Sequence, residues 1–141
     1  MLKNPALIVL VAGTLLTGAG CGGSQSPTVQ PGAGRLKVEQ TVDRTGPIPI
    51  EGAYSYVRVE NDGGDAVVEE RLPSGGKATI NLDAGTYRMI SYQRTCDGNC
   101  GSLDAASDRC AKEFTLNRGD ETRATVRVTY GSGCTIRFDT A

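Results

Sequence analysis

The chain has no histidine and no tryptophan among its 141 residues, and only two phenylalanines. Without histidine, Ser-His-Asp and Cys-His catalytic arrangements, an imidazole base and a His-ligated metal are all excluded. The adjacent carboxylates Glu69-Glu70 and Asp120-Glu121 fall in expected strands or turns, where neighbouring side chains point apart. A lysine-assisted serine and a carboxylate dyad are the remaining catalytic alternatives, but we expect no enzyme activity and no cofactor.

An excess of charge of one sign and a long apolar run are also lacking. Lys plus Arg is 15 against Asp plus Glu at 16, which argues against electrostatic binding of nucleic acid. The apolar run at residues 6–16 is too short to span a bilayer, which needs about 20 residues. Because Lys3 precedes this run and small residues follow it at 17–20, it is typical of an export signal.

A cysteine directly follows this signal, in the sequence Gly18-Ala19-Gly20-Cys21. The motif resembles the lipobox of bacterial lipoproteins, although Gly18 stands where that pattern usually has Leu. The resemblance implies cleavage before Cys21, a diacylglyceryl thioether on its sulfur and acylation of its new amino group. The five cysteines of the chain agree with this, since setting Cys21 aside leaves an even four. Ordinary secretion with cleavage nearby is the alternative.

This processing divides the chain into three parts. Residues 1–20 are the expected signal peptide. Residues 21–34 are the lipidated Cys21 and an uncharged tether rich in Gly, Ser and Pro, which cannot bury enough surface to fold. Residues 35–141 are the folded domain. Two or three acyl chains anchor strongly, so we expect a protein attached to the cell membrane on its extracytoplasmic face.

Apolar and polar residues alternate with a period of two in the folded part, for example in residues 36–42 and 121–130. Turn residues separate such segments, as in Asn61-Asp62-Gly63-Gly64. Many short strands with turns between them are typical of a sandwich. We predict an all-β fold, a single antiparallel β-sandwich of about seven to eight short strands. The expected strands are residues 36–42, 55–60, 66–71, 77–82, 86–94, 111–116, 121–130 and 135–138.

One segment of about 40 residues carries a more specific pattern. Tyr56-Val57-Arg58-Val59 is followed by Asp62-Gly63-Gly64, a short segment at 75–82 and then Ala84-Gly85-Thr86-Tyr87. This order resembles the prealbumin-like sandwich domains, which include carboxypeptidase-regulatory-like and collagen-adhesin B-type domains. The resemblance implies the fold and says almost nothing about function. The Lys-Asn isopeptide bond of the collagen-adhesin relatives is not expected, because Lys37 is in place but the last strand has no Asn.

The four later cysteines are expected to form disulfides, as in other small exported domains. If the strands from residue 86 onward alternate in direction, Cys96, Cys100, Cys110 and Cys134 all fall at one pole. Cys96 and Cys110 would then flank one hairpin, which favours pairing Cys96 with Cys110 and Cys100 with Cys134. The competing set pairs Cys96 with Cys100 and Cys110 with Cys134. Four thiolates holding zinc is a further alternative, but the spacing lacks the close pairs of zinc sites.

The hydrophilic loop between Cys96 and Cys110 is the candidate binding loop. Its carboxylates and amides are also a conceivable calcium site, although no Glu closes the loop as an EF-hand requires. We therefore expect no metal. The tripeptide Arg118-Gly119-Asp120 spells an integrin-type motif but falls where a hairpin turn must lie. The candidate binding residues are Asp97, Asn99, Asp104, Asp108 and Arg109, with Tyr54, Tyr56 and Tyr92 as possible contributors.

Two classes of function are consistent with these features. The first is a membrane-anchored binding or interaction module that presents the loop and the tyrosines to a protein or glycan. The second is a structural or accessory envelope lipoprotein without a soluble ligand. A third, weaker class is a protease-inhibitor-like module, since a rigid disulfide-framed loop loses little entropy on binding.

Overall fold

The computed structural model describes residues 32–43, 52–73, 76–96, 98 and 100–140. The expected signal peptide, Cys21 and nearly all of the tether lie outside these residues. So do Asp97 and Asn99 of the candidate loop.

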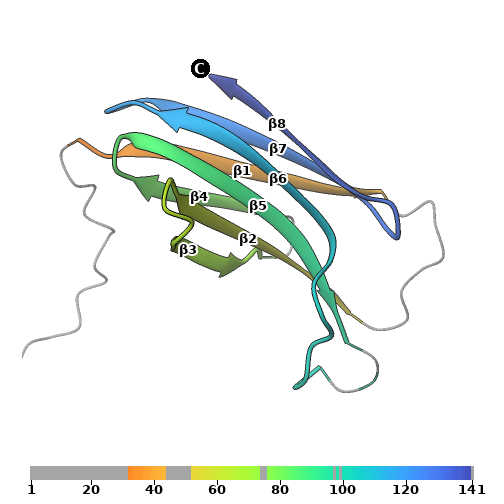
Figure 1. Ribbon diagram of the computed structural model, residues 1–141. Helices are drawn as coiled ribbons and strands as arrows, with labels where there is room; N and C mark the ends of the chain where they lie inside the picture. The colour runs from red at the N-terminus through yellow and green to blue at the C-terminus, as the bar shows by residue number, and fades with distance from the viewer. Residues whose placement is uncertain (1–31, 44–51, 74–75, 97, 99, 141) are drawn as a thin grey trace, which may run out of the picture.

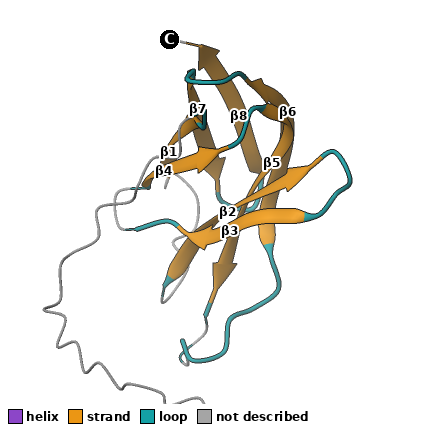
Figure 2. Ribbon diagram, turned by 90° about the vertical axis from the view of Figure 1, so that its left-hand side faces the viewer, coloured by secondary structure: helices purple, strands orange, loops and turns teal. Residues whose placement is uncertain are grey.

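Eight strands form two four-stranded sheets, which confirms the predicted all-β sandwich (Figures 1 and 2). One sheet has the strand order β4-β1-β7-β8, and the other has the order β3-β2-β5-β6. The strands are β1 (Gly34–Asp43), β2 (Ala53–Asn61), β3 (Ala66–Arg71), β4 (Lys77–Leu82), β5 (Gly85–Thr95), β6 (Ser107–Leu116), β7 (Glu121–Thr129) and β8 (Gly133–Thr140).

Strand direction departs from the prediction at one pair. Strands β1 and β7 run parallel, in register from Arg35 opposite Glu121 to Asp43 opposite Thr129. The other five described pairings are antiparallel. The alternation of residues specifies which side chains point inward but carries no information about strand direction, so the wholly antiparallel arrangement was wrong at this position.

Two tight turns follow from their residues. In the β2–β3 turn, the Asn61 side-chain oxygen accepts a hydrogen bond from the Asp65 backbone at 3.0 Å, and Gly64 adopts a φ of 83°. In the β6–β7 turn, the Asp120 backbone donates to the Asn117 carbonyl at 3.2 Å. Arg118-Gly119-Asp120 therefore lies in a hairpin turn, as predicted.

Inward-facing residues of both sheets form the core. In β1 and β7 these are the apolar positions that alternate with charged or hydroxyl residues, and Ala124, Val126 and Val128 are fully buried. The buried core cluster is Leu36, Val38, Val57, Val59, Leu72, Ile80, Leu82, Met89, Phe114, Leu116, Ala124, Val126, Val128 and Ile136. Burial of these side chains holds the two sheets together.

The disulfides correct the favoured pairing. Cys96 is bonded to Cys100, and Cys110 is bonded to Cys134. Cys110 lies opposite Ser91 in the β5–β6 ladder. Ser91 precedes Cys96 by five residues, and a strand rises about 3.3 Å per residue. Cys96 is therefore too far along the strand to reach Cys110. The bond from Cys110 to Cys134 instead links β6 to β8 and so joins the edges of the two sheets.

Candidate binding face

The outer surface of the β3-β2-β5-β6 sheet gathers tyrosine and charged side chains. Val57 and Val59 of β2 point into the core, so Tyr54, Tyr56 and Arg58 point away from it. Directly opposite Tyr56, β5 places Tyr92 and β3 places Arg71. We call this surface the outer face, and define it by Tyr54, Tyr56, Arg58, Glu60, Glu69, Arg71, Ile90, Tyr92, Arg94 and Arg109.

The three tyrosines suggested by the sequence lie together on the outer face. The rings of Tyr56 and Tyr92 are stacked, with centroids 5.2 Å apart and planes 5° from parallel. The guanidinium carbon of Arg71 lies 3.7 Å above the centre of the Tyr54 ring, which is a cation–π contact. Stacking fixes the ring orientations, so this part of the face presents rigid aromatic surface.

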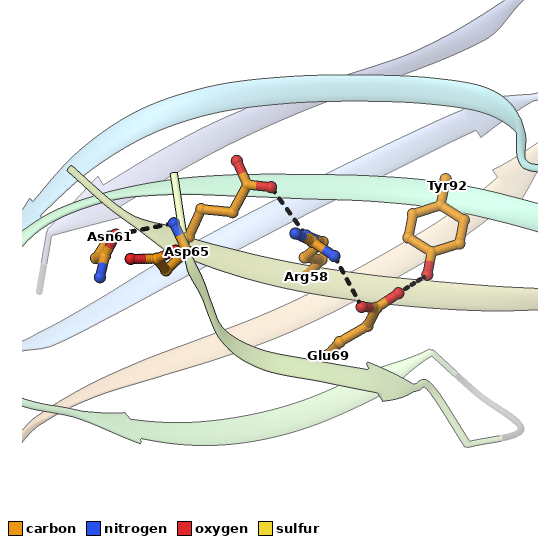
Figure 3. A network of polar contacts seen from close by, with 6 residues as sticks. Arg58, Asn61, Asp65, Glu69 and Tyr92 are labelled. Carbon is orange, nitrogen blue, oxygen red and sulfur yellow. Dashed lines mark hydrogen bonds and ion pairs between the residues drawn. The ribbon is translucent and has the colours of Figure 1, made fainter. Parts of the chain in front are cut away.

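A network of polar contacts crosses three strands beside the tyrosines (Figure 3). Arg58 of β2 donates to Glu60 at 2.8 Å and to Glu69 of β3 at 3.0 Å. The hydroxyl of Tyr92 on β5 donates to the other carboxylate oxygen of Glu69. Glu69 therefore joins the edge strand β3 to the two strands inside it.

The pKa values of Glu69 and Tyr92 in this network are shifted in opposite directions. The hydrogen bond from Tyr92, supported by Arg58, holds the pKa of Glu69 below its usual range. Burial of the phenol, together with the nearby Glu69 carboxylate, raises the pKa of Tyr92 to about 12. At neutral pH the network therefore contains a carboxylate acceptor and a neutral phenol donor.

Next to the network, the outer face is hollowed into a depression of about 430 Å³. Ile90 is only 1% exposed and Tyr92 only 9% exposed, although neither belongs to the core cluster between the sheets. They are the buried members of its lining. Among the described residues the exposed guanidinium of Arg109 has no carboxylate partner, so it is available to an incoming group. The lining residues are Arg58, Glu60, Glu69, Ile90, Tyr92, Arg94, Ala106 and Arg109.

The candidate binding loop is tied back to the end of β5. Arg94 donates to the backbone oxygens of Leu103 at 2.9 Å and Asp104 at 2.8 Å. The Thr95 hydroxyl donates to the Asp104 carboxylate at 2.8 Å. The loop projects beyond the ends of the strands in Figure 1, and its base is anchored by these bonds. Asp104 therefore has a structural role in shaping the loop.

Asp108 is held in a different place. It has a positive φ of 46°, and its carboxylate accepts a hydrogen bond from the Gly133 backbone at 3.1 Å. Asp104 and Asp108 are therefore bound to separate parts of the chain, rather than brought together as calcium ligands. Within the described ranges, no three His, Cys, Asp or Glu residues are grouped as a metal site would need. The disulfides also rule out a zinc site built from the four thiolates.

Of the predicted binding residues, the outer face therefore unites Tyr54, Tyr56, Tyr92 and Arg109. No protein-family model matches the chain, and no curated protein is significantly similar to it. The described part of the chain also contains no helix with the length and apolar character needed to cross a membrane.

Sequence reasoning missed the partners of Glu69 and the buried position of Ile90. A signal for the network was present, because Tyr54, Tyr56, Arg58 and Glu60 alternate with the core residues of β2 and so must share a face. The contact of Glu69 with Tyr92 reaches across the intervening strand β2. Such a contact depends on sheet order, which the alternation does not specify.

Proposed function

We propose that the protein is a membrane-anchored, extracytoplasmic lipoprotein whose sandwich acts as a binding or interaction module. Support for export comes from residues 1–20, the lipobox-like motif ending at Cys21 and two disulfides in a small domain. In this proposal the uncharged residues 22–34 tether the sandwich to the membrane surface.

The outer face is the proposed binding surface for a protein or glycan. The observation that carries this proposal is the depression, whose lining includes buried Ile90 and Tyr92 and an Arg109 that has no ion-pair partner among the described residues. Five of its eight lining residues are charged, so recognition at this site rests on polar and ionic contacts. Arginine and tyrosine are also enriched among residues that dominate binding energy. Acidic or hydroxyl-rich groups on the partner suit the Arg109 guanidinium.

We also propose the prealbumin-like relationship. Its support is that the segment carrying the resemblance forms four consecutive strands, from β2 through β5, with Gly85 opening β5. Lys37, the residue that the isopeptide-forming relatives would use, is instead paired with Glu121 at 2.8 Å.

An apolar docking surface has little support within the described residues. Val67 is the one large hydrophobic side chain there that is strongly exposed, at 44%. A contiguous apolar patch of several hundred Å² would have favoured a role as an accessory subunit. A module that binds through polar and aromatic groups is therefore the better supported of the two classes.

Affinity capture of the intact membrane protein, with a glycan array in parallel, tests this proposal. Arg109→Ala removes the rim guanidinium, and Arg127→Ala is the matched control because Arg127 is an exposed arginine of β7 in the other sheet. Loss of a hydrogen bond to a charged group costs about 1.5–3 kcal/mol. We therefore expect the same ligand to be captured at least tenfold less by Arg109→Ala and equally well by Arg127→Ala. Equal capture by both variants would contradict the proposal.

A further inference from the structure

A second hollow lies between the two sheets, at the pole where β1, β3 and β5 end. It has a volume of about 400 Å³. We call it the pole pocket. Its lining is Gln40, Val42, Ala53, Tyr54, Ser55, Arg71, Leu72, Pro73, Gly76, Gln93 and Tyr130. It meets the outer face only at Tyr54 and Arg71, and its other lining residues are separate.

Gln40 is the unusual residue of the pole pocket. It occupies an inward position of β1, two residues after the core residue Val38, and it is only 5% exposed. Neither its side-chain nitrogen nor its side-chain oxygen has a hydrogen-bond partner among the described residues. Most buried polar groups are hydrogen-bonded, so this amide calls for partners from outside the chain, a water or a ligand. Both atoms have less than 1 Å² of accessible surface, so the side chain has to turn toward the hollow to meet a ligand there.

The neighbouring groups hold the backbone of Gln40 in place but form no hydrogen bonds with its side-chain amide. Its backbone nitrogen donates to the Gly76 carbonyl at 2.7 Å. Gly76 has a φ of 65°, and a Cβ there would lie 2.6 Å from the Gln40 carbonyl oxygen, so only glycine allows this approach. Gln93 and Ser55 are hydrogen-bonded to each other at 3.0 Å, which fixes a second polar group in the pocket.

The chemistry of the lining selects a class of ligand. Among the described residues, no carboxylate lines the pocket and Arg71 is the one charged side chain there, which disfavours a cationic ligand. The remaining polar groups are amides and hydroxyls. Val42 and Leu72 supply apolar wall, and Tyr54 and Tyr130 supply aromatic rings. A ligand with neutral polar groups on one edge and C–H surface elsewhere fits this combination.

We propose that the pole pocket binds one sugar ring, free or at the end of a glycan, through two adjacent hydroxyl groups. Each hydroxyl is both a donor and an acceptor. One therefore accepts from the Gln40 side-chain nitrogen, and its neighbour donates to the Gln40 side-chain oxygen. A single trans peptide group cannot satisfy both atoms in this way, since its N–H and C=O point in opposite directions. A sugar is thus favoured over a peptide backbone.

The test is titration of the full-length protein with glucose, galactose and mannose, followed by calorimetry and by NMR of the glutamine side-chain amides. Gln40→Met keeps the length of the side chain but removes both polar atoms. Thr122→Val is the matched control, because Thr122 has another buried, unpartnered side-chain oxygen but does not line the pocket. We expect at least one sugar to bind, with the Gln40 amide signals shifting, and Gln40→Met to weaken binding at least tenfold while Thr122→Val leaves it unchanged.

Several results would overturn the inference. One is the absence of binding by all three sugars at concentrations well above about 1 mM, the weak end of specific affinity. Another is equal binding by wild type and Gln40→Met. A third is binding of the peptide tri-alanine with the same Gln40 shifts and no response to the sugars. If Gln40→Met lowers the melting temperature, the amide shifts of the wild-type protein alone decide the outcome. Because Arg109 does not line the pole pocket, failure here leaves the proposed function of the outer face untouched.

Discussion

The bond between Cys110 and Cys134 should contribute more to stability than any other single covalent feature of the sandwich. It joins β6 to β8 across the edges of the two sheets and spans 24 positions of sequence. Closing a loop of that length in the unfolded chain corresponds to about 3.5 kcal/mol in the chain-entropy estimate. The double variant Cys110→Ala/Cys134→Ala should therefore lose about this much free energy of unfolding.

The second disulfide provides the matched comparison. Cys96 and Cys100 are only 4 positions apart, for which the same estimate is about 2 kcal/mol. The double variant Cys96→Ala/Cys100→Ala should accordingly be the less destabilised of the two. Cys96 is 1% exposed, so its replacement also leaves a small cavity. This cavity reduces the difference in free energy of unfolding between the two double variants.

Urea unfolding of the purified protein measures both effects. With a denaturant slope of about 1–3 kcal/mol per molar, a loss of about 3.5 kcal/mol lowers the midpoint by roughly 1–3.5 M. Wild type treated with reductant should unfold at a lower midpoint than either double variant. The reasoning is refuted if the Cys110/Cys134 variant is no less stable than the Cys96/Cys100 variant, or if reduction leaves the midpoint unchanged.

Three further predictions concern the outer face and the Gly76 turn. Because the pKa of Tyr92 is about 12 when folded and about 10 when unfolded, stability should fall as pH rises between these values, by up to about 3 kcal/mol. Tyr92→Phe should remove this fall and the highest phenolate transition in an ultraviolet titration. Glu69→Gln should lower the pKa of Tyr92, since a neutral amide replaces the carboxylate, and should make the loss of stability below about pH 4.5 shallower in acid unfolding curves. Gly76→Ala should lower the free energy of unfolding by about 1–3 kcal/mol, measured by thermal melting, because the φ of Gly76 is positive and a Cβ would meet the Gln40 carbonyl. Gly64→Ala should lower it by less, because a Cβ at Gly64 meets nothing within 4 Å.

Much of the fold could be predicted because the alternation of side chains is strong. Apolar residues at Leu36 and Val38, and at Ala124, Val126 and Val128, specified two strands and their inward faces. The residues Asn61 to Gly64 specified a hairpin turn by their tolerance of positive φ. Each of the eight expected segments overlaps one strand of the structure.

Strand direction and disulfide pairing could not be predicted in the same way. A period of two is identical for parallel and antiparallel neighbours, so the β1–β7 pairing left no trace in the sequence. The choice of cysteine pairs depended on register, and a register shift lies between Ser91 and Gln93, close to Cys96. Only the position of Cys110 opposite Ser91 shows that the favoured hairpin bridge was out of reach.

The candidate site was partly predictable for the same reason. The tyrosines of β2 share a face by alternation, and Tyr92 joined them because its strand pairs with β2 in register. The roles of Asp104 and Asp108 were not visible, since each is fixed by a contact with a distant backbone group. Gln40 was placed in a strand by its pattern, but its lack of a partner emerges only once both sheets are assembled.

The most direct measurement is mass spectrometry of the protein isolated from its native envelope, with digestion under non-reducing conditions. We expect an acylated Cys21 at the N-terminus, Cys96 linked to Cys100, and Cys110 linked to Cys134. Free thiols at the four later cysteines, a peptide joining Cys96 to Cys110, or an unmodified Cys21 within a longer chain would contradict an exported, lipid-anchored sandwich held together by these bonds.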